Sequence, residues 1–261
     1  MVFHNFTMSI RIAREITQEF YISQPSHIAI EEIAAYRGVL KHLAILEGCD
    51  ARLVLNSKYK TGIATISSAI IEEGRKRFAL AHELGHFELH KNNKQIWTCT
   101  ESDFLKWYHS NDEEPEANAF AGELLMPDEL FRRHCVGKKP GFSSVSELTE
   151  LFHTSLTSTA VRYTEIGNYP CALIASREGK ISWFRVSNDF NHRLLSPGAK
   201  LNPYSCAGDY FYNHIIPPHQ PEQVEAGCWL ENTNGNDGYF LYEESIAMPN
   251  YGVVLTMIWK K

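Results

Sequence analysis

The sequence predicts an α+β protein: a helical core with a small antiparallel sheet, then a helix-turn-helix-like segment, then a C-terminal β-rich α+β domain. Three observations support this prediction. Helical periodicity dominates the chain up to residue 168, short β-favouring runs interrupt it between residues 51 and 70, and β-rich runs follow from residue 169. We therefore predict three domains, at residues 1–136, 137–168 and 169–261.

The chain opens with two amphipathic helical patterns and a pair of strands. Apolar residues at helical spacing occupy residues 10–16 and 28–43, with a proline-containing turn between the two patterns. Residues 51–56 and 62–70 are rich in β-favouring side chains and flank a polar turn. We expect these two runs to pair as strands.

Two further helices are predicted in the same part of the chain. Residues 76–90 lack proline and contain good helix formers. After an expected loop at residues 98–112, a second helix runs to Met126 and ends before Pro127. Pro115 is compatible with that helix because it lies in the first turn.

The first of these helices contains His82, Glu83 and His86, an HExxH motif. Residues four apart on a helix share one face, about 5–6 Å apart, so both imidazoles can bind one metal ion. Glu83 lies beside them, where a carboxylate can take a proton from a water molecule. The alternative is that all three are ordinary core or surface residues, but the helix is apolar on two sides and buried histidines need partners.

A catalytic zinc site needs a third protein ligand, and His90 is a poor choice. At about 1.5 Å rise per residue, His82 and His90 lie about 12 Å apart along the helix axis. We therefore expect His90 to support the ligands or the helix. The longer metzincin pattern is also excluded, because Leu89 and Asn92 stand where it requires glycine and histidine.

The helix that follows supplies carboxylates near a buried face. Its apolar stripe is defined by Ala117, Phe120, Ala121 and Leu124. Glu113 falls within that stripe and Glu114 just past its edge, whereas Glu116 and Glu123 lie outside it. Because a carboxylate on a buried stripe calls for a cation, the third ligand is Glu113 or Glu114. The alternative is that both acids only interact favourably with the positive end of the helix dipole in the first turn.

Residues 77–90 (RFALAHELGHFELH) and 114–127 (EPEANAFAGELLMP) resemble, in sequence and order, the ImmA/IrrE family of metallopeptidases. The resemblance implies a gluzincin-like site with His82, His86 and Glu114 as ligands and Glu83 as the catalytic acid/base. It implies zinc, with manganese as an alternative. Residues 1–136 would then be a zincin-like minimal peptidase core. Family members typically cut a helix-turn-helix transcriptional repressor in stress responses or mobile elements, which suggests such a partner here.

Residues 144–152 and 156–166 form a helix-turn-helix pattern. It favours helical packing or substrate docking, because Arg162 is one of few basic residues near the second helix. The alternative function is a DNA-binding transcriptional regulator that uses the metal structurally.

The aromatic-rich region after residue 169 is explained by core packing, with a recognition surface and a sensory or regulatory role as the alternative.

Where a substrate would lie is less constrained. The strand near residues 65–70 is expected to present an edge on which an extended peptide binds. Tyr163 and Arg162 are weak candidates for stabilising an oxyanion.

Bulk properties exclude several classes of protein. The net charge of −6 gives no electrostatic footprint for nucleic acid or anionic membrane. Six cysteines occur without a CxxC pair, and we find no signal peptide or long apolar span, so a cytoplasmic protein with reduced thiols and no membrane partner is expected. Each cysteine is expected to be a small buried hydrophobe.

Overall fold

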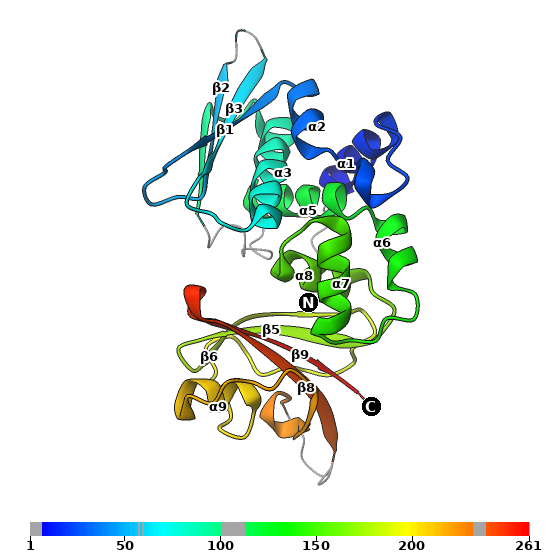
Figure 1. Cartoon of the computed structure of the whole chain (residues 1–261), viewed down its shortest axis with the longest axis vertical. Coiled ribbons are helices and arrows are strands. Elements are labelled where there is room, and N and C mark those ends of the chain that lie inside the picture. Colours follow the sequence, from blue (N-terminus) through cyan, green and yellow to red (C-terminus); the bar gives the residue numbers. More distant parts are fainter. Residues whose placement is uncertain (1–6, 57, 59, 101–112, 232–238, 261) are drawn as a thin grey trace. The chain divides into compact units, whose positions relative to one another are not determined.

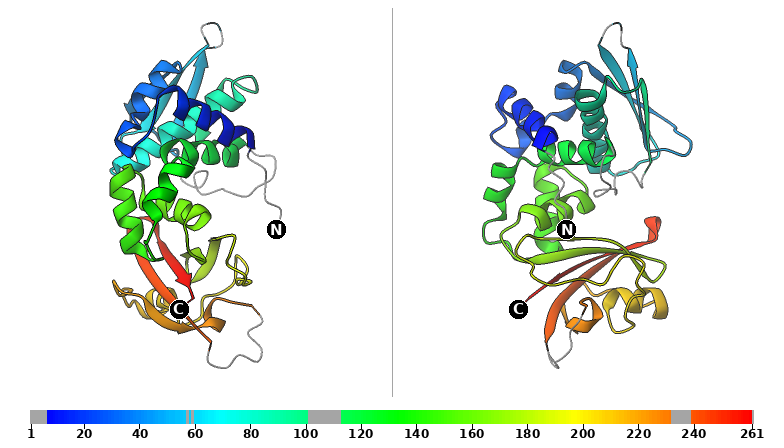
Figure 2. Two further views of the ribbon diagram at one scale, coloured as in Figure 1. Left: turned by 90° about the vertical axis from the view of Figure 1, so that its right-hand side faces the viewer. Right: turned by 180° about the vertical axis from the view of Figure 1, so that it is seen from behind.

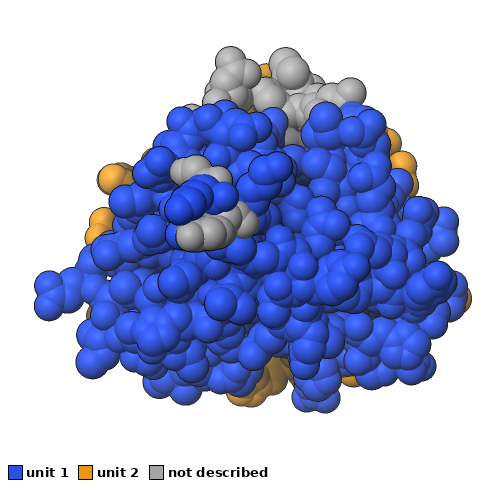
Figure 3. Space-filling model, turned by 90° about the horizontal axis from the view of Figure 1, so that it is seen from above, with its two compact units in different colours: residues 1–133, 149–158 blue, residues 134–148, 159–261 orange. Residues whose placement is uncertain are grey.

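The computed structural model describes residues 7–56, 58, 60–100, 113–231 and 239–260 (Figure 1). The fold is α+β, and the chain divides into two compact units (Figure 3). Unit 1 contains residues 1–133 and 149–158, and unit 2 contains residues 134–148 and 159–261. The boundary between the two units passes through both helices of the helix-turn-helix-like segment. The three domains predicted from the sequence stay a prediction.

Unit 1 combines helices with one small sheet. Its elements in chain order are α1 (Thr7–Glu19), a short 3-10 turn η1 (Pro25–His27), α2 (Ile30–Tyr36), β1 (Val39–Ala44), β2 (Ala51–Asn56), β3 (Thr61–Ser67), α3 (Glu73–His90), β4 (Ile96–Cys99) and α5 (Glu113–Leu125). The next helix, α6 (Asp128–Cys135), leads out of the unit. The helices predicted at residues 10–16, 76–90 and 112–126 correspond to α1, α3 and α5.

The four strands of unit 1 form a mixed sheet in the order β1-β3-β2-β4. The predicted pairing of residues 51–56 with 62–70 is confirmed, since β2 and β3 are antiparallel. The prediction of a wholly antiparallel sheet is wrong, because β1 pairs with β3 in parallel. β1 also contains Leu40 and Leu43, which we assigned to a helix: α2 ends at Tyr36, and Gly38, with a φ of 95°, turns the chain into the sheet.

β3 lies inside the sheet, with β1 on one side and β2 on the other. The prediction of a free edge near residues 65–70 is therefore wrong. Within the described residues, the edge strands are β1 and β4.

Helix α3 lies along the inner face of this sheet and crosses α5 (Figures 1 and 2). The two helices approach most closely at Gly85, where an added Cβ would lie 3.1 Å from Ala117 Cα and 3.1 Å from Phe120 Cδ1. Only a glycine allows this spacing without displacing α5. The close crossing places the middle of α3 beside the first turns of α5.

The first turns of α3 also contact residues 153–154, which explains why residues 149–158 belong to unit 1. A Cβ on Gly74 would lie 2.3 Å from the carbonyl carbon of Thr154. Arg77 donates to two main-chain oxygens, those of His153 at 3.0 Å and Ile28 at 2.8 Å. The start of α3 is thereby held between two segments that are distant in sequence.

Unit 2 is built on a five-stranded antiparallel sheet in the order β6-β5-β9-β8-β7. Helices α7 (Phe142–Phe152) and α8 (Leu156–Ile166) precede it, and its elements are β5 (Cys171–Arg177), β6 (Lys180–Val186), α9 (Cys206–Asn213), β7 (Glu222–Glu225), η2 (Ala226–Cys228), β8 (Phe240–Met248), η3 (Pro249–Tyr251) and β9 (Val253–Trp259). The predicted β-rich character after residue 169 is confirmed, and α9 is an addition. Trp229 and many of the sheet's inward side chains form one apolar core.

No helix among the described residues combines the length and apolar character needed to span a membrane.

Candidate metal centre

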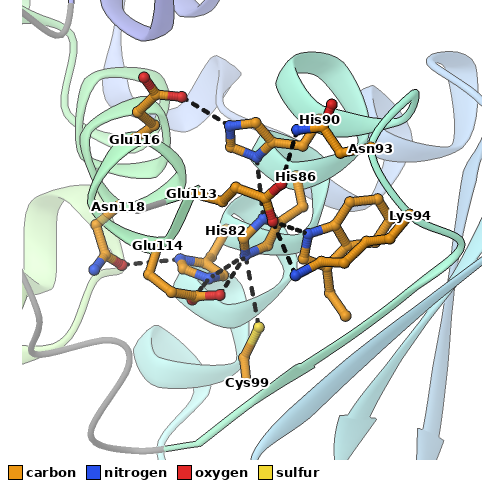
Figure 4. A network of polar contacts seen from close by, with 11 residues as sticks. His82, His86, His90, Asn93, Lys94, Cys99, Glu113, Glu114, Glu116 and Asn118 are labelled. Atoms are coloured by element: carbon orange, nitrogen blue, oxygen red, sulfur yellow. Dashed lines mark hydrogen bonds and ion pairs between the residues drawn. The ribbon is translucent and has the colours of Figure 1, made fainter. Parts of the chain in front are cut away.

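Three elements of unit 1 bring donor atoms to one point (Figure 4). Helix α3 contributes His82 and His86, α5 contributes Glu114, and the end of β4 contributes Cys99. One donor atom from each of these residues lies within 4.8 Å of all the others. Both histidines are fully buried.

The histidine nitrogens face each other and the carboxylate. His82 Nε2 lies 2.9 Å from His86 Nε2 and 3.0 Å from Glu114 Oε2. His86 Nε2 lies 3.4 Å from Glu114 Oε1. The tautomer of each imidazole therefore decides what this cluster can bind.

The tautomer of His82 follows from its other nitrogen. Its Nδ1 lies 2.9 Å from the amide oxygen Oδ1 of Asn118, which is buried on α5. An amide oxygen only accepts hydrogen bonds, so Nδ1 carries the proton and donates it. Nε2 of His82 then presents a lone pair to the cluster.

The tautomer of His86 follows from a chain of two contacts. Glu116 Oε2 lies 2.8 Å from His90 Nε2, and His90 Nδ1 lies 3.2 Å from His86 Nδ1. The carboxylate accepts the Nε2 proton of a neutral His90, so His90 Nδ1 accepts in turn from His86 Nδ1. Nε2 of His86 is left with a lone pair. His90 thus contacts His86 and is absent from the donor group of His82 and Glu114.

These assignments bring two imidazole lone pairs and a carboxylate together in a buried place, where they repel one another without a cation. A proton is a poor substitute, because burial lowers the pKa of His86 to about 4. Two nitrogens and one carboxylate fit a divalent transition metal.

Glu113 and Glu114 have different partners. Trp97 Nε1 and Asn93 Nδ2 each donate to Glu113 at 2.8 Å, and Lys94 Nζ lies 2.9 Å away. Although partial burial raises it, these hydrogen bonds lower the pKa of Glu113 to about 2. Glu113 Oε, His86 and His90 form a second group of donor atoms within 4.8 Å. Glu114 alone of the two acids reaches both HExxH histidines.

Glu83 is fully buried, and neither carboxylate oxygen has a hydrogen-bond partner among the described residues. Burial raises the pKa of Glu83 to about 7, although the nearby His82 acts in the opposite direction. A carboxylate with a pKa near neutrality is suited to accept and return a proton.

Sequence periodicity misjudged one acid of α5. We expected Glu123 outside the buried face, but it is 2% exposed. Helix α1 covers that side of α5, and Arg14 Nε donates to Glu123 Oε1 at 2.8 Å. The apolar stripe showed only the side of α5 that packs on α3.

Two residues at the centre were not singled out from the sequence. Asn118 lies one helical turn after Glu114, a spacing that places both on the same face and is a usable signal. Cys99 was assigned to a loop of residues 98–112, but it ends β4, and residues 101–112 lie outside the described part of the chain.

The oxyanion candidate Tyr163 donates its hydroxyl to Lys138 O at 2.7 Å within unit 2, and Arg162 is 8% exposed.

Comparison with known proteins gives a family for part of the chain and a similar fold. Residues 65–164 match the family model described as the IrrE N-terminal-like domain. A Mycobacterium tuberculosis transcriptional regulator of known structure has a similar fold, with a TM-score of 0.62 and 15% identity over 99% of this chain and 77% of that chain. No curated protein matches the sequence. The chain carries an ImmA/IrrE-family metallopeptidase domain at residues 65–164, with His82 and His86 in its metal-site cluster.

Proposed function

We propose that this protein is a zinc-dependent endopeptidase that cuts a regulatory protein, specifically a helix-turn-helix transcriptional repressor. The observation that carries the catalytic part is the buried pair of Nε2 lone pairs beside Glu114 and the unpartnered carboxylate of Glu83. The substrate class rests on the resemblance to the ImmA/IrrE family. Cleavage would relieve repression in a stress response or a mobile element, in the cytoplasm.

In this proposal His82, His86 and Glu114 hold the metal. A bound zinc ion would polarise the scissile carbonyl and acidify a water molecule. Glu83 accepts the proton of that water and delivers it to the leaving amine. Asn118 and the pair of His90 and Glu116 fix the histidine tautomers.

β4 is the strand on which an extended substrate would lie. Among described residues it pairs only with β2, and we propose that the substrate adds to its other edge by β-augmentation. The strand is adjacent to the centre, because Trp97 stacks on His86 with ring centroids 5.6 Å apart. β4 replaces residues 65–70 in this role.

The main experiment compares Glu83→Gln with Glu73→Gln, a change at an exposed position of the same helix. The zinc-loaded proteins are incubated with the helix-turn-helix repressor encoded nearest to the gene, and fragments are identified by mass spectrometry. We expect Glu83→Gln to keep its metal and to lose about 10²–10⁴-fold in cleavage rate, as for removal of a general base. Normal cleavage by this variant would overturn the mechanism. Metal analysis of the purified protein distinguishes zinc from manganese.

The second candidate is a DNA-binding transcriptional regulator with a structural metal. The name of the structurally similar M. tuberculosis protein and the two consecutive helices α7 and α8 favour it. It predicts salt-dependent gel shifts on nearby operators that Glu83→Gln leaves unchanged, and no cleaved fragment of any repressor.

A further inference from the structure

The Cys99 thiol belongs to the cluster that contains the two histidines and Glu114. Its Sγ lies 3.7 Å from His86 Nε2, and the side chain is fully buried. The alternation of β4 explains the orientation, because Trp97 and Cys99 face α3 while Ile96 and Thr98 face outward. Figure 4 shows the sulfur below the histidine nitrogens, with a dashed line to one of them.

The spacing is that of two ligands on one ion. Zinc binds sulfur at about 2.3 Å and histidine nitrogen at about 2.0–2.1 Å, so two such ligands at a tetrahedral angle lie roughly 3.5 Å apart. The observed 3.7 Å between Cys99 and His86 is close to this value. The 3.4 Å between His86 Nε2 and Glu114 Oε1 is similar.

A second observation points to the same place. One donor atom from each of Cys99, His82, His86 and Glu114 lies within 4.8 Å of all the others. The cluster therefore offers four donor atoms to one ion. Four protein ligands make a closed centre, whereas a catalytic zinc site keeps one position open.

We propose that Cys99 is a fourth metal ligand that closes the centre, and that hydrolysis requires Cys99 to leave the metal. This inference rests on the proposed peptidase function and adds its regulation. On closure, the Cys99 sulfur would give up its proton to water and donate an electron pair to the metal. On opening, the metal–sulfur bond would break, and the sulfur would keep the pair and recover a proton from water. Closure would thus block the position that a water molecule needs.

The test uses the full-length protein loaded with cobalt(II), which reports thiolate ligation through a charge-transfer band in the near ultraviolet. We expect this band in the wild-type protein and its loss in Cys99→Ser. Cys49→Ser is the matched control, because Cys49 is a second buried cysteine, just before β2, and belongs to neither donor group of the described residues. The control is expected to keep the band.

Two further measurements accompany the spectrum. Zinc affinity, from competition with a chelator, is expected to fall on the order of tenfold or more in Cys99→Ser. Cleavage by the zinc-saturated variant is expected to be faster than by the wild type. A second variant, Cys99→Ala, is made as well. Circular dichroism of Cys99→Ser and Cys99→Ala shows whether each variant keeps the fold.

The outcomes separate this inference from the proposed function. Cobalt binding without a thiolate band in the wild type, or a band that persists in folded Cys99→Ser, overturns the role of Cys99 and leaves the peptidase proposal intact. Normal cleavage by Glu83→Gln overturns the peptidase proposal, while the band would still establish the sulfur ligand.

Discussion

The two histidines of α3 are held in place by residues outside the cluster of His82, His86, Cys99 and Glu114. Asn118 accepts from His82 Nδ1, and His90, held by Glu116, contacts His86 Nδ1. Each contact keeps the proton away from the nitrogen that faces Glu114. At the scale of single residues, metal affinity should therefore depend on these acceptors as well as on the ligands.

Asn118→Ala tests this dependence. Without its acceptor, the His82 ring is no longer held in one tautomer and orientation, and we expect zinc affinity to fall about 10–100-fold. Competition with a chelator measures the change. Asn56→Ala, at an exposed position of β2, should leave the affinity unchanged. Equal affinities for both variants would contradict the role of Asn118.

The raised pKa of Glu83 predicts that the stability of the metal-free protein depends on pH. Burial raises its pKa from the ordinary 4.5 to about 7, so the folded state binds the proton more tightly than the unfolded state. The contribution of Glu83 to the free energy of unfolding is complete below pH 4.5 and is lost as the pH rises through 7. His86 acts oppositely: burial lowers its pKa from 6.5 to about 4, so its neutral form favours folding and stability falls as the pH falls through this range.

Metal-free Glu83→Gln isolates the first effect. Above pH 7 we expect it to be more stable than the metal-free wild type by on the order of 3 kcal/mol at most, and the difference should shrink toward pH 4. Urea unfolding at several pH values in the presence of a chelator measures this. A difference that does not vary with pH would show that Glu83 is not the cause.

At the scale of elements, the crossing of α3 and α5 sets the distance between the histidines and Glu114. Gly85 permits this crossing because its missing Cβ leaves room for Ala117. Ala117 lies one turn after Glu114, so a displacement of α5 at Ala117 also displaces that carboxylate.

Gly85→Ala should therefore disturb both stability and the site. The added methyl group forces neighbouring atoms to move by tenths of an ångström, and we expect a net loss of about 1–2 kcal/mol in unfolding free energy together with weaker zinc binding. Gly122→Ala, on α5, is the matched control: nothing lies within 4 Å of its added Cβ, and alanine favours the helix by up to about 1 kcal/mol. Similar effects of both changes on zinc binding would contradict this account.

At the scale of the molecule, each unit has its own buried apolar residues and its own buried carboxylates. In unit 2, Glu243 accepts from Trp229 Nε1 at 2.8 Å and from Ser245 Oγ at 3.1 Å, and burial raises its pKa. The metal cluster lies wholly in unit 1. Changes in the two units should therefore affect different steps of unfolding.

Calorimetry of Glu243→Ala and of the chelated wild type tests this separation. Removing the metal should lower the stability of unit 1, by about 2.7 kcal/mol where free zinc had been at 100 times its Kd. Glu243→Ala should destabilise unit 2 by about 1–3 kcal/mol, because buried donors lose their acceptor, and should leave zinc affinity unchanged. A single transition shifted by both changes would show that the units unfold together.

The sequence by itself determined what depends on local periodicity. The spacing of His82 and His86 put them on one helix face, the rise of the helix separated His90 from their shared metal, and alternation predicted the β-rich C-terminal part. Local pattern also identified α5 as the source of a carboxylate. It left Glu113 and Glu114 as alternatives, because both lie in one turn near the edge of one stripe.

Tertiary structure decided everything that depends on which neighbour covers which face. Trp97 on β4 donates a hydrogen bond to Glu113, and the helix crossing at Gly85 brings Glu114 to the histidines. Helix α1 buries Glu123, and β1 pairs with the sheet in parallel. Cys99 comes to the cluster through strand pairing alone. Such contacts join residues distant in the chain, and periodicity reports only the faces of a single element.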